Sequence, residues 1–124
     1  MKNKAVKGRY RPQYPAKYNG NVNRITYRSL WERRFMLYCD RSDQIIKWSS
    51  EELHIPYVAP KDLRWHNYYP DFMVNTRDGR VILVEIKPHY QRKYKVNQAK
   101  WAAAEEYCEQ HGYEFVVLTE KELF

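Results

Sequence analysis

The sequence has few cysteines and no long apolar run, and both shortages narrow what the protein can be. Its 124 residues, a length that fits one domain, include two cysteines, Cys39 and Cys108. The longest aliphatic run covers residues 81–84, whereas a membrane-spanning helix needs about 20 apolar residues. No apolar stretch of a secretory signal follows the basic N-terminus. We therefore expect one intracellular domain, no membrane, and two reduced buried thiols rather than a disulfide or metal site.

Acidic residues are absent from the first 24 positions. Residues 1–24 carry seven of the 22 lysines and arginines and no acid, so the net charge of +7 arises there, while residues 25–124 are balanced. Three tyrosines lie among these cations, without helical or strand periodicity, which predicts a flexible basic arm. Such an arm suits nucleic acid because cations release counterions from phosphate and aromatic rings stack on bases. Lys7, Arg9 and Arg11 are the candidate contacts; a merely solvated tail is the alternative.

The remaining residues, 25–124, predict an α/β domain with a central mixed β-sheet flanked by helices, in the core order αβββαβ. Aromatic residues at helical spacing predict a helix over 27–40, capped by Asn23 or Thr26, with four rings facing the core: Tyr27, Trp31, Phe35 and Tyr38. Strand patterns cover 44–48, 53–58, 68–75 and 80–87, with a loop or hairpin end over 59–66. A helix over 95–111 stopped by Gly112, and a strand over 113–118 parallel to residues 81–86, complete the domain.

Three charged residues at the ends of two predicted strands stand out. Asp71 follows Pro70, and Glu85 and Lys87 close a strand that is otherwise aliphatic. Side chains alternate along a strand, so Glu85 and Lys87 point to one face while Ile86 points to the other. A buried sheet normally excludes such a charged pair, so we expect a chemical role for it. A capped turn and a simple ion pair at a strand end are the alternative interpretation.

The length of the turn at Asp78-Gly79 decides whether Asp71 joins that pair. With a two-residue loop, Asp71 lies opposite Ile86 and on the wrong face. With a three-residue loop and Gly79 in the left-handed conformation, Asp71 lies opposite Glu85 and the two carboxylates share a face. We predict the three-residue loop, or a bulge with the same effect.

Two carboxylates on adjacent strands repel unless one is protonated or a cation bridges them. Mg²⁺ prefers hard oxygen ligands and keeps several waters, so Asp71 and Glu85 predict a magnesium site, with Mn²⁺ as a substitute and no organic cofactor. Glu32, on the first helix, is expected to complete the metal shell directly or through water. Lys87 is the candidate to orient a water or to stabilise developing charge on a phosphate.

Pro70-Asp71 followed by Glu85-Ile86-Lys87, with a helical glutamate upstream, resembles the PD-(D/E)XK nuclease superfamily over about residues 26–120. Within it the chain is most similar to the head completion nucleases of T-even-like tailed bacteriophages, through Gly8-Arg9-Tyr10, Tyr27-Arg28-Ser29 and residues 47–52. The resemblance implies a restriction-endonuclease-like fold, the Ile86 carbonyl as a further metal ligand, and Mg²⁺-dependent cleavage of packaged DNA before tail joining. It also implies portal or neck proteins as partners, in the cytoplasm of the infected host or in the virion.

The stretch from residue 86 to residue 104 has no acid and directly follows the strand with Glu85, so we expect it to flank a bound phosphate backbone. The full set of predicted DNA contacts is Lys7, Arg9, Arg11, Arg28, Ser29, Arg92, Lys93, Lys95, Gln98 and Lys100. Two alternatives remain open. One is a structural or DNA-binding component of a phage neck without nuclease activity, and the other is a transposon end-cleaving subunit with a similar core.

Overall fold

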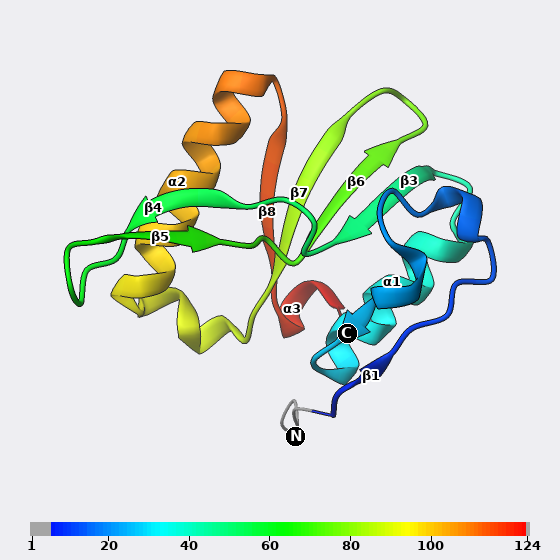
Figure 1. Ribbon diagram of the computed structural model, residues 1–124, viewed down its shortest axis with the longest axis horizontal. Helices are drawn as coiled ribbons and strands as arrows, with labels where there is room; N and C mark the ends of the chain where they lie inside the picture. Colours follow the sequence, from blue (N-terminus) through cyan, green and yellow to red (C-terminus); the bar gives the residue numbers. More distant parts are fainter. Residues whose placement is uncertain (1–5, 124) are drawn as a thin grey trace.

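A four-stranded mixed sheet forms the centre of the computed structural model, which describes residues 6–123 (Figure 1). Its strand order is β3 (Ile45–Ser50), β6 (Phe72–Thr76), β7 (Val81–Ile86) and β8 (Glu114–Leu118). The first three strands pair antiparallel, and β8 runs parallel to β7. The parallel pair is connected by α2 (Lys95–His111), as predicted, and Gly112 ends that helix with φ 73°. The fold is the expected restriction-endonuclease-like one.

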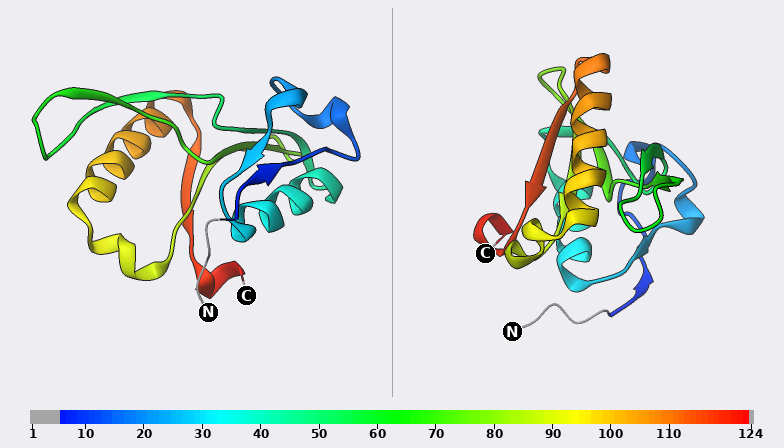
Figure 2. Two further views of the ribbon diagram at one scale, coloured as in Figure 1. Left: turned by 60° about the horizontal axis from the view of Figure 1, so that its bottom comes forward. Right: turned by 90° about the vertical axis from the view of Figure 1, so that its left-hand side faces the viewer.

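Each face of the sheet carries its own hydrophobic cluster. The helix α1 (Leu30–Arg41) covers one face and packs on Phe72, Val74 and Val84. The other face packs, through Leu83, against α2 and a separate hairpin of β4 (Ile55–Val58) and β5 (Trp65–Tyr68). This hairpin extends beyond the sheet alongside α2 (Figures 1 and 2). Because Asp71 and Glu85 follow the alternation of Met73 and Leu83, they belong to the face with α2 and β5.

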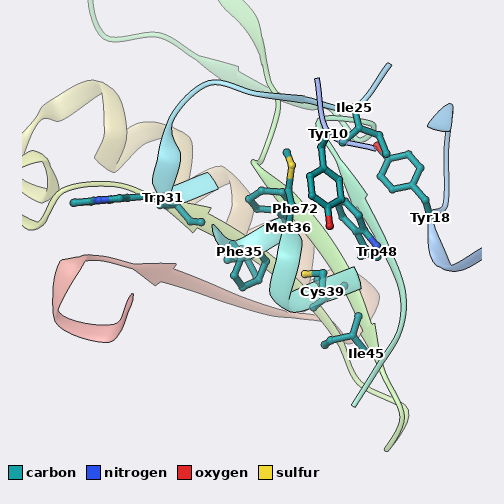
Figure 3. Packing of buried hydrophobic residues seen from close by; sticks show 13 residues of the cluster. Tyr10, Tyr18, Ile25, Trp31, Phe35, Met36, Cys39, Ile45, Trp48 and Phe72 are labelled. Atoms are coloured by element: carbon teal, nitrogen blue, oxygen red, sulfur yellow. The ribbon is translucent and has the colours of Figure 1, made fainter. Parts of the chain in front are cut away.

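The prediction of a flexible arm over residues 1–24 is wrong for the described part, residues 6–24. Strand β1 (Gly8–Arg9) pairs with β2 (Thr26–Tyr27), and the rings of Tyr10 and Tyr18 are buried against Trp48 (Figure 3). Two of the three tyrosines that the charge pattern assigned to a tail are therefore part of the core, because their burial offsets the ordering of the backbone, while Tyr14 stays exposed. Residues 1–5 lie outside the described residues.

A buried carboxylate attaches this N-terminal segment to the helix. Asp40 is 1% exposed. Its carboxylate accepts hydrogen bonds from the Tyr10 hydroxyl and the backbone N–H of Gln13, both at 2.7 Å, and from the N–H of Tyr14 at 3.0 Å. Lys17 donates to the carbonyls of Asp40 and Ser42 at the C-terminal end of α1. The segment is thus fixed by a buried carboxylate and, through Lys17, by backbone carbonyls at the end of the helix.

Helix α1 begins three residues later than predicted. Ser29, rather than Asn23 or Thr26, is its N-cap, because its Oγ accepts from the N–H of Glu32 at 3.2 Å. Of the four predicted core rings, Trp31 and Phe35 are buried, Tyr27 is partly buried, and Tyr38 is 52% exposed. The predicted start of the helix at residue 27 is wrong because residues 26 and 27 form a strand that pairs with β1.

The three-residue loop between β6 and β7 is confirmed. The N–H of Thr76 donates to the carbonyl of Arg80 at 2.9 Å, and Gly79 has φ 90°. The strand pairs run from Asn75↔Val81 to Phe72↔Val84, and one step further in the same register places Asp71 opposite Glu85, where the Asp71 N–H donates to the Glu85 carboxylate. The hairpin turn at one end of these strands therefore sets which residues meet at the other.

The other elements differ from the prediction mainly in their ends. The segment predicted as one strand over 68–75 divides at residues 69–71, between β5 and β6, and the C-terminal helix α3 (Glu120–Leu123) was not predicted. Cys39 and Cys108 are buried free thiols, as expected. Within residues 6–123, no helix combines the length and apolar character required to cross a membrane.

Candidate active site

Asp71 and Glu85 meet where β6 begins and β7 ends. The N–H of Ile86 donates to Oδ2 of Asp71 at 2.8 Å, and the N–H of Asp71 donates to Oε1 of Glu85 at 3.3 Å. Glu85 is only 3% exposed. Backbone hydrogen bonds thus hold two carboxylates next to each other in a largely buried position.

Tyr68, at the end of β5, fixes the orientation of Glu85. Its hydroxyl donates to Oε1 of Glu85 at 2.6 Å, and Tyr68 is 3% exposed. The ammonium of Lys100, on α2, lies 5.9 Å from the centre of the Tyr68 ring. On the other side, Nζ of Lys87 lies 4.0 Å from Oε2 of Glu85. One carboxylate oxygen is therefore held by two donors, while the second faces a lysine.

Glu32 approaches from the first turn of α1. Its Oε1 accepts a hydrogen bond from the backbone N–H of Arg28 at 2.8 Å, close to the arrangement of a capping box. Arg28 in turn forms a two-pronged ion pair with Glu51, at 3.0 Å. Glu51 has φ 56°, and its N–H donates to the Asp71 carbonyl at 3.2 Å. Helix α1 and the end of β3 are thereby joined beside Asp71.

A cleft of about 560 Å³ opens where the start of α1 faces the end of β7 and the turn that follows it. Glu32, Ile86 and Lys87 lie along its wall, whereas Asp71 and Glu85 do not line it and are joined to it by the bond to the Ile86 N–H and the contact with Lys87. The other lining residues are Arg28, Ser29, Trp31, Pro88, Tyr90, Gln91 and Glu120.

The three carboxyls share an unusual electrostatic environment. Burial, and then the charges of Glu85 and Glu32, raise the pKa of Asp71 well above its ordinary value. Burial also raises the pKa of Glu85, opposed by the Tyr68 hydrogen bond and by Lys87. Burial and the charge of Glu51 raise the pKa of Glu32, although the Arg28 N–H and Lys87 lower it. Carboxyl groups whose pKa values are raised by burial and by one another's charge often mark a functional site, so this cluster is a candidate.

The chemistry of these donors suits a hard divalent cation. Within residues 6–123, no hydrogen bond is formed to Oδ1 of Asp71 or Oε2 of Glu85, so each carboxylate keeps one oxygen for another partner. A cation between them would relieve the repulsion that helps to raise the pKa of Asp71 and would offset the burial of both charges. In the described residues, no three His, Cys, Asp or Glu side chains are grouped closely enough to hold a metal by themselves. A cation here would need ligands besides carboxylates, as Mg²⁺ commonly does.

Comparison with known proteins places the chain among nucleases. The model of the family described as TnsA-like endonuclease N terminal matches residues 42–120. The chain belongs to this family. This TnsA-like chain is also 30% identical, over 138 aligned positions, to the head completion nuclease of Enterobacteria phage T4, with 94% of the chain and 92% of that protein covered. The resemblance to PD-(D/E)XK nucleases, including the head completion group, is thus confirmed.

The family match contains Asp71, Glu85 and Lys87 but begins after Glu32. The structure nevertheless brings Glu32 and Lys87 to the same cleft and Glu32 within electrostatic reach of Asp71. The four residues predicted from the sequence are therefore together in the TnsA-like fold. Their roles in metal binding and catalysis remain predictions.

Some of the predicted DNA contacts are exposed, and others already interact with groups of the protein itself. Ser29 is 6% exposed and its hydroxyl caps α1, so it offers little surface to a ligand, and the Arg28 guanidinium is paired with Glu51. Lys100 lies beside Tyr68 near Glu85, closer to the carboxylates than its place in a basic run indicated. The remaining predicted contacts are exposed: Lys7, Arg9, Arg11, Arg92, Lys93, Lys95 and Gln98.

Sequence reasoning missed Tyr68, Gln91 and Glu120. Tyr68 reaches Glu85 only because the chain bends between β5 and β6, which no local pattern announced. Gln91 and Glu120 line the cleft, and Oε1 of Glu120 accepts from the N–H of His89 at 2.9 Å. Pro88, which ends β7 next to the charged pair, was the one available signal that the following turn would remain near the site.

Proposed function

We propose that this TnsA-like nuclease is a Mg²⁺-dependent endonuclease that hydrolyses phosphodiester bonds in DNA. The observation that carries the proposal is the pairing of two buried carboxylates with raised pKa values beside Lys87. Asp71 and Glu85 would hold the ion with the carbonyl of Ile86, and Glu32 would act directly or through water. When bound, such an ion supplies a polarised phosphate oxygen and a more acidic water.

The protein's own groups account for the positioning. Oε1 of Glu85 is fixed by Tyr68 and by the Asp71 N–H, which leaves Oε2 directed toward Lys87. Lys87 lines the cleft, so its ammonium is available to a phosphate or to an attacking water. Charge on that ammonium stabilises the negative charge that develops on phosphate oxygens. The low exposure of Glu85 reduces competition from bulk water.

The biological stage is inferred from the relative. Because the similarity to the T4 head completion nuclease covers nearly all of both chains, we propose that this protein trims packaged phage DNA during head completion, before head–tail joining. Portal or neck proteins would then be its partners, and DNA its substrate. Mn²⁺ is expected to replace Mg²⁺. A transposon end-cleaving role is less favoured, because the TnsA-like match covers only residues 42–120 of this chain.

A plasmid nicking assay tests the proposal. Wild-type protein should convert supercoiled plasmid to nicked or linear forms with Mg²⁺ and stop with EDTA. Lys87→Ala should lower the rate by about 10²-fold or more, the typical loss when one electrostatic stabiliser is removed. Lys121→Ala, at an exposed position on α3, is the matched control and should cleave normally. Cleavage that persists in EDTA, or a full rate with Lys87→Ala, would contradict the proposal, whereas salt-dependent DNA binding without any cleavage would support a DNA-binding neck component instead.

A further inference from the structure

Four arginines gather in a second depression on the molecule, separate from the cleft with Lys87. This arginine groove, about 340 Å³ in volume, lies between the N-terminal segment and α1, and Arg9, Arg11, Arg33 and Arg41 line it. Figure 1 shows β1 running beside α1, which brings arginines from two distant parts of the sequence together. Packing of the N-terminal segment therefore creates a surface that a flexible arm would not have.

Counter-charge is scarce in the arginine groove. Asp40 is its one acidic lining residue, and its carboxylate is buried and occupied by hydrogen bonds from residues 10, 13 and 14. Within residues 6–123, none of the four arginines forms an ion pair; Arg33 lies 6.0 Å from the centre of the Tyr27 ring. Cations held together without acids repel one another, and a bound anion removes that repulsion.

The arginine groove and the active-site cleft are lined by consecutive residues of the chain. Tyr27 lines the arginine groove, and the next residue, Arg28, lines the cleft with Glu32 and Lys87. Arg33 and Arg41 are eight residues apart on α1, which corresponds to about 12 Å along the helix axis. DNA presents one phosphate of each strand per about 3.4 Å of its axis, so two cations this far apart can contact different phosphates. The two depressions thus adjoin at residues 27 and 28, within reach of one DNA strand.

We infer that the arginine groove binds the phosphate backbone of the DNA flanking the cleavage position, with Arg33 and Arg41 as contacts. The inference rests on the proposed function in that DNA is the partner. The fork of donors on arginine suits phosphate oxygens, and such contacts hold DNA in register without reading its sequence. The groove is therefore a positioning surface, and the cleft with Lys87 remains the place of chemistry.

The test is the salt dependence of DNA affinity, measured in EDTA so that no cleavage occurs. Fluorescence anisotropy with a labelled duplex gives the dissociation constant over a range of KCl concentrations. Arg33→Ala and Arg41→Ala should each reduce the slope of log affinity against log salt by about 0.9, and the double variant by about 1.8. Between 50 and 200 mM salt, wild-type protein should then lose about twelvefold more affinity than the double variant.

Two controls separate charge from damage to the fold. Arg80→Ala removes an arginine already paired with Asp78 and Glu114, so the slope should not change. Replacing Arg33 and Arg41 by lysine keeps both charges and should keep the wild-type slope. A wild-type slope in the double alanine variant, or a low slope in the lysine variant, overturns the inference. If the alanine variants keep the wild-type slope and the wild-type protein nicks DNA, only the DNA-binding role of the groove is contradicted. If the slopes fall as predicted but the wild-type protein does not nick DNA, the proposed nuclease chemistry is contradicted instead.

Discussion

Replacing Asp71 by asparagine should make the metal-free protein more stable. Asparagine keeps an oxygen to accept the Ile86 N–H but removes a charge beside Glu85. Opposed residues on adjacent antiparallel strands have Cβ atoms about 5 Å apart, and two unit charges at that distance repel by about 3 kcal/mol at an effective dielectric constant of about 20. Partial protonation reduces this, so we expect a gain on the order of 2 kcal/mol, or about 8 °C in Tm.

The gain should depend on pH with a definite sign. Burial raises the pKa of Asp71 and Glu85, so the folded protein binds protons more tightly than the unfolded chain. The contribution of these carboxyls to stability is present at acid pH and lost as the pH rises through their folded pKa values. The Asp71→Asn gain should be small at about pH 4 and largest at about pH 8.

Thermal unfolding by circular dichroism across this pH range, in EDTA, measures the effect. Addition of Mg²⁺ should raise the Tm of the wild type and not that of Asp71→Asn; a ligand at ten times its Kd contributes about 1.4 kcal/mol. The control is Asp78→Asn, a carboxylate in the exposed turn, whose pKa is lowered by hydrogen bonds from Thr76 and Arg80 and whose loss should not stabilise. Lower stability of Asp71→Asn than wild type at about pH 8 would refute the reasoning.

Three further changes test separate contacts. Tyr68→Phe removes the hydroxyl that lowers the pKa of Glu85, so the acid side of the pH–rate profile for nicking should move to higher pH, with about a tenfold lower rate at low pH. An unchanged profile would contradict the role of Tyr68 in setting the pKa of Glu85. Glu32→Gln keeps an oxygen that accepts the Arg28 N–H, so the free energy of unfolding should change by less than about 0.5 kcal/mol, while the nicking rate should fall about 10–100-fold. A normal nicking rate would exclude Glu32 from the active site. Asp40→Ala leaves three donors without their acceptor, so the free energy of unfolding in urea should fall by about 3 kcal/mol and hydrogen exchange in residues 6–24 should become faster. A much smaller fall in the free energy of unfolding would contradict the role of Asp40 in attaching residues 6–24.

The convergence of Asp71 and Glu85 could be predicted because it depends on local rules. The glycine at position 79 determines the loop, the loop determines the register, and strand alternation determines the face. Helix α2 and strand β8, which runs parallel to β7, could also be predicted, because an alanine-rich periodic segment that ends at Gly112 and is followed by a strand pattern indicates a helical crossover.

The N-terminal segment and Tyr68 could not be predicted for the same physical reason. Tyr10 and Tyr18 become core residues only because α1 and β3 offer a surface for them, and that surface is made by residues far along the chain. The charged residues of such a segment predict which side chains face solvent, but they do not predict which aromatic side chains are buried. Tyr68 likewise finds Glu85 through a bend between two strands of different sheets. Long-range packing decided both cases.

Direct titration of the metal tests the central claim, that Asp71 and Glu85 hold one divalent cation. Mn²⁺ binding followed by electron paramagnetic resonance should show one site per chain in the wild type, displaced by Mg²⁺. The double variant Asp71→Asn, Glu85→Gln keeps both backbone hydrogen bonds at the site and should lose that binding. Equal Mn²⁺ affinity in the wild type and in this folded double variant would contradict the account.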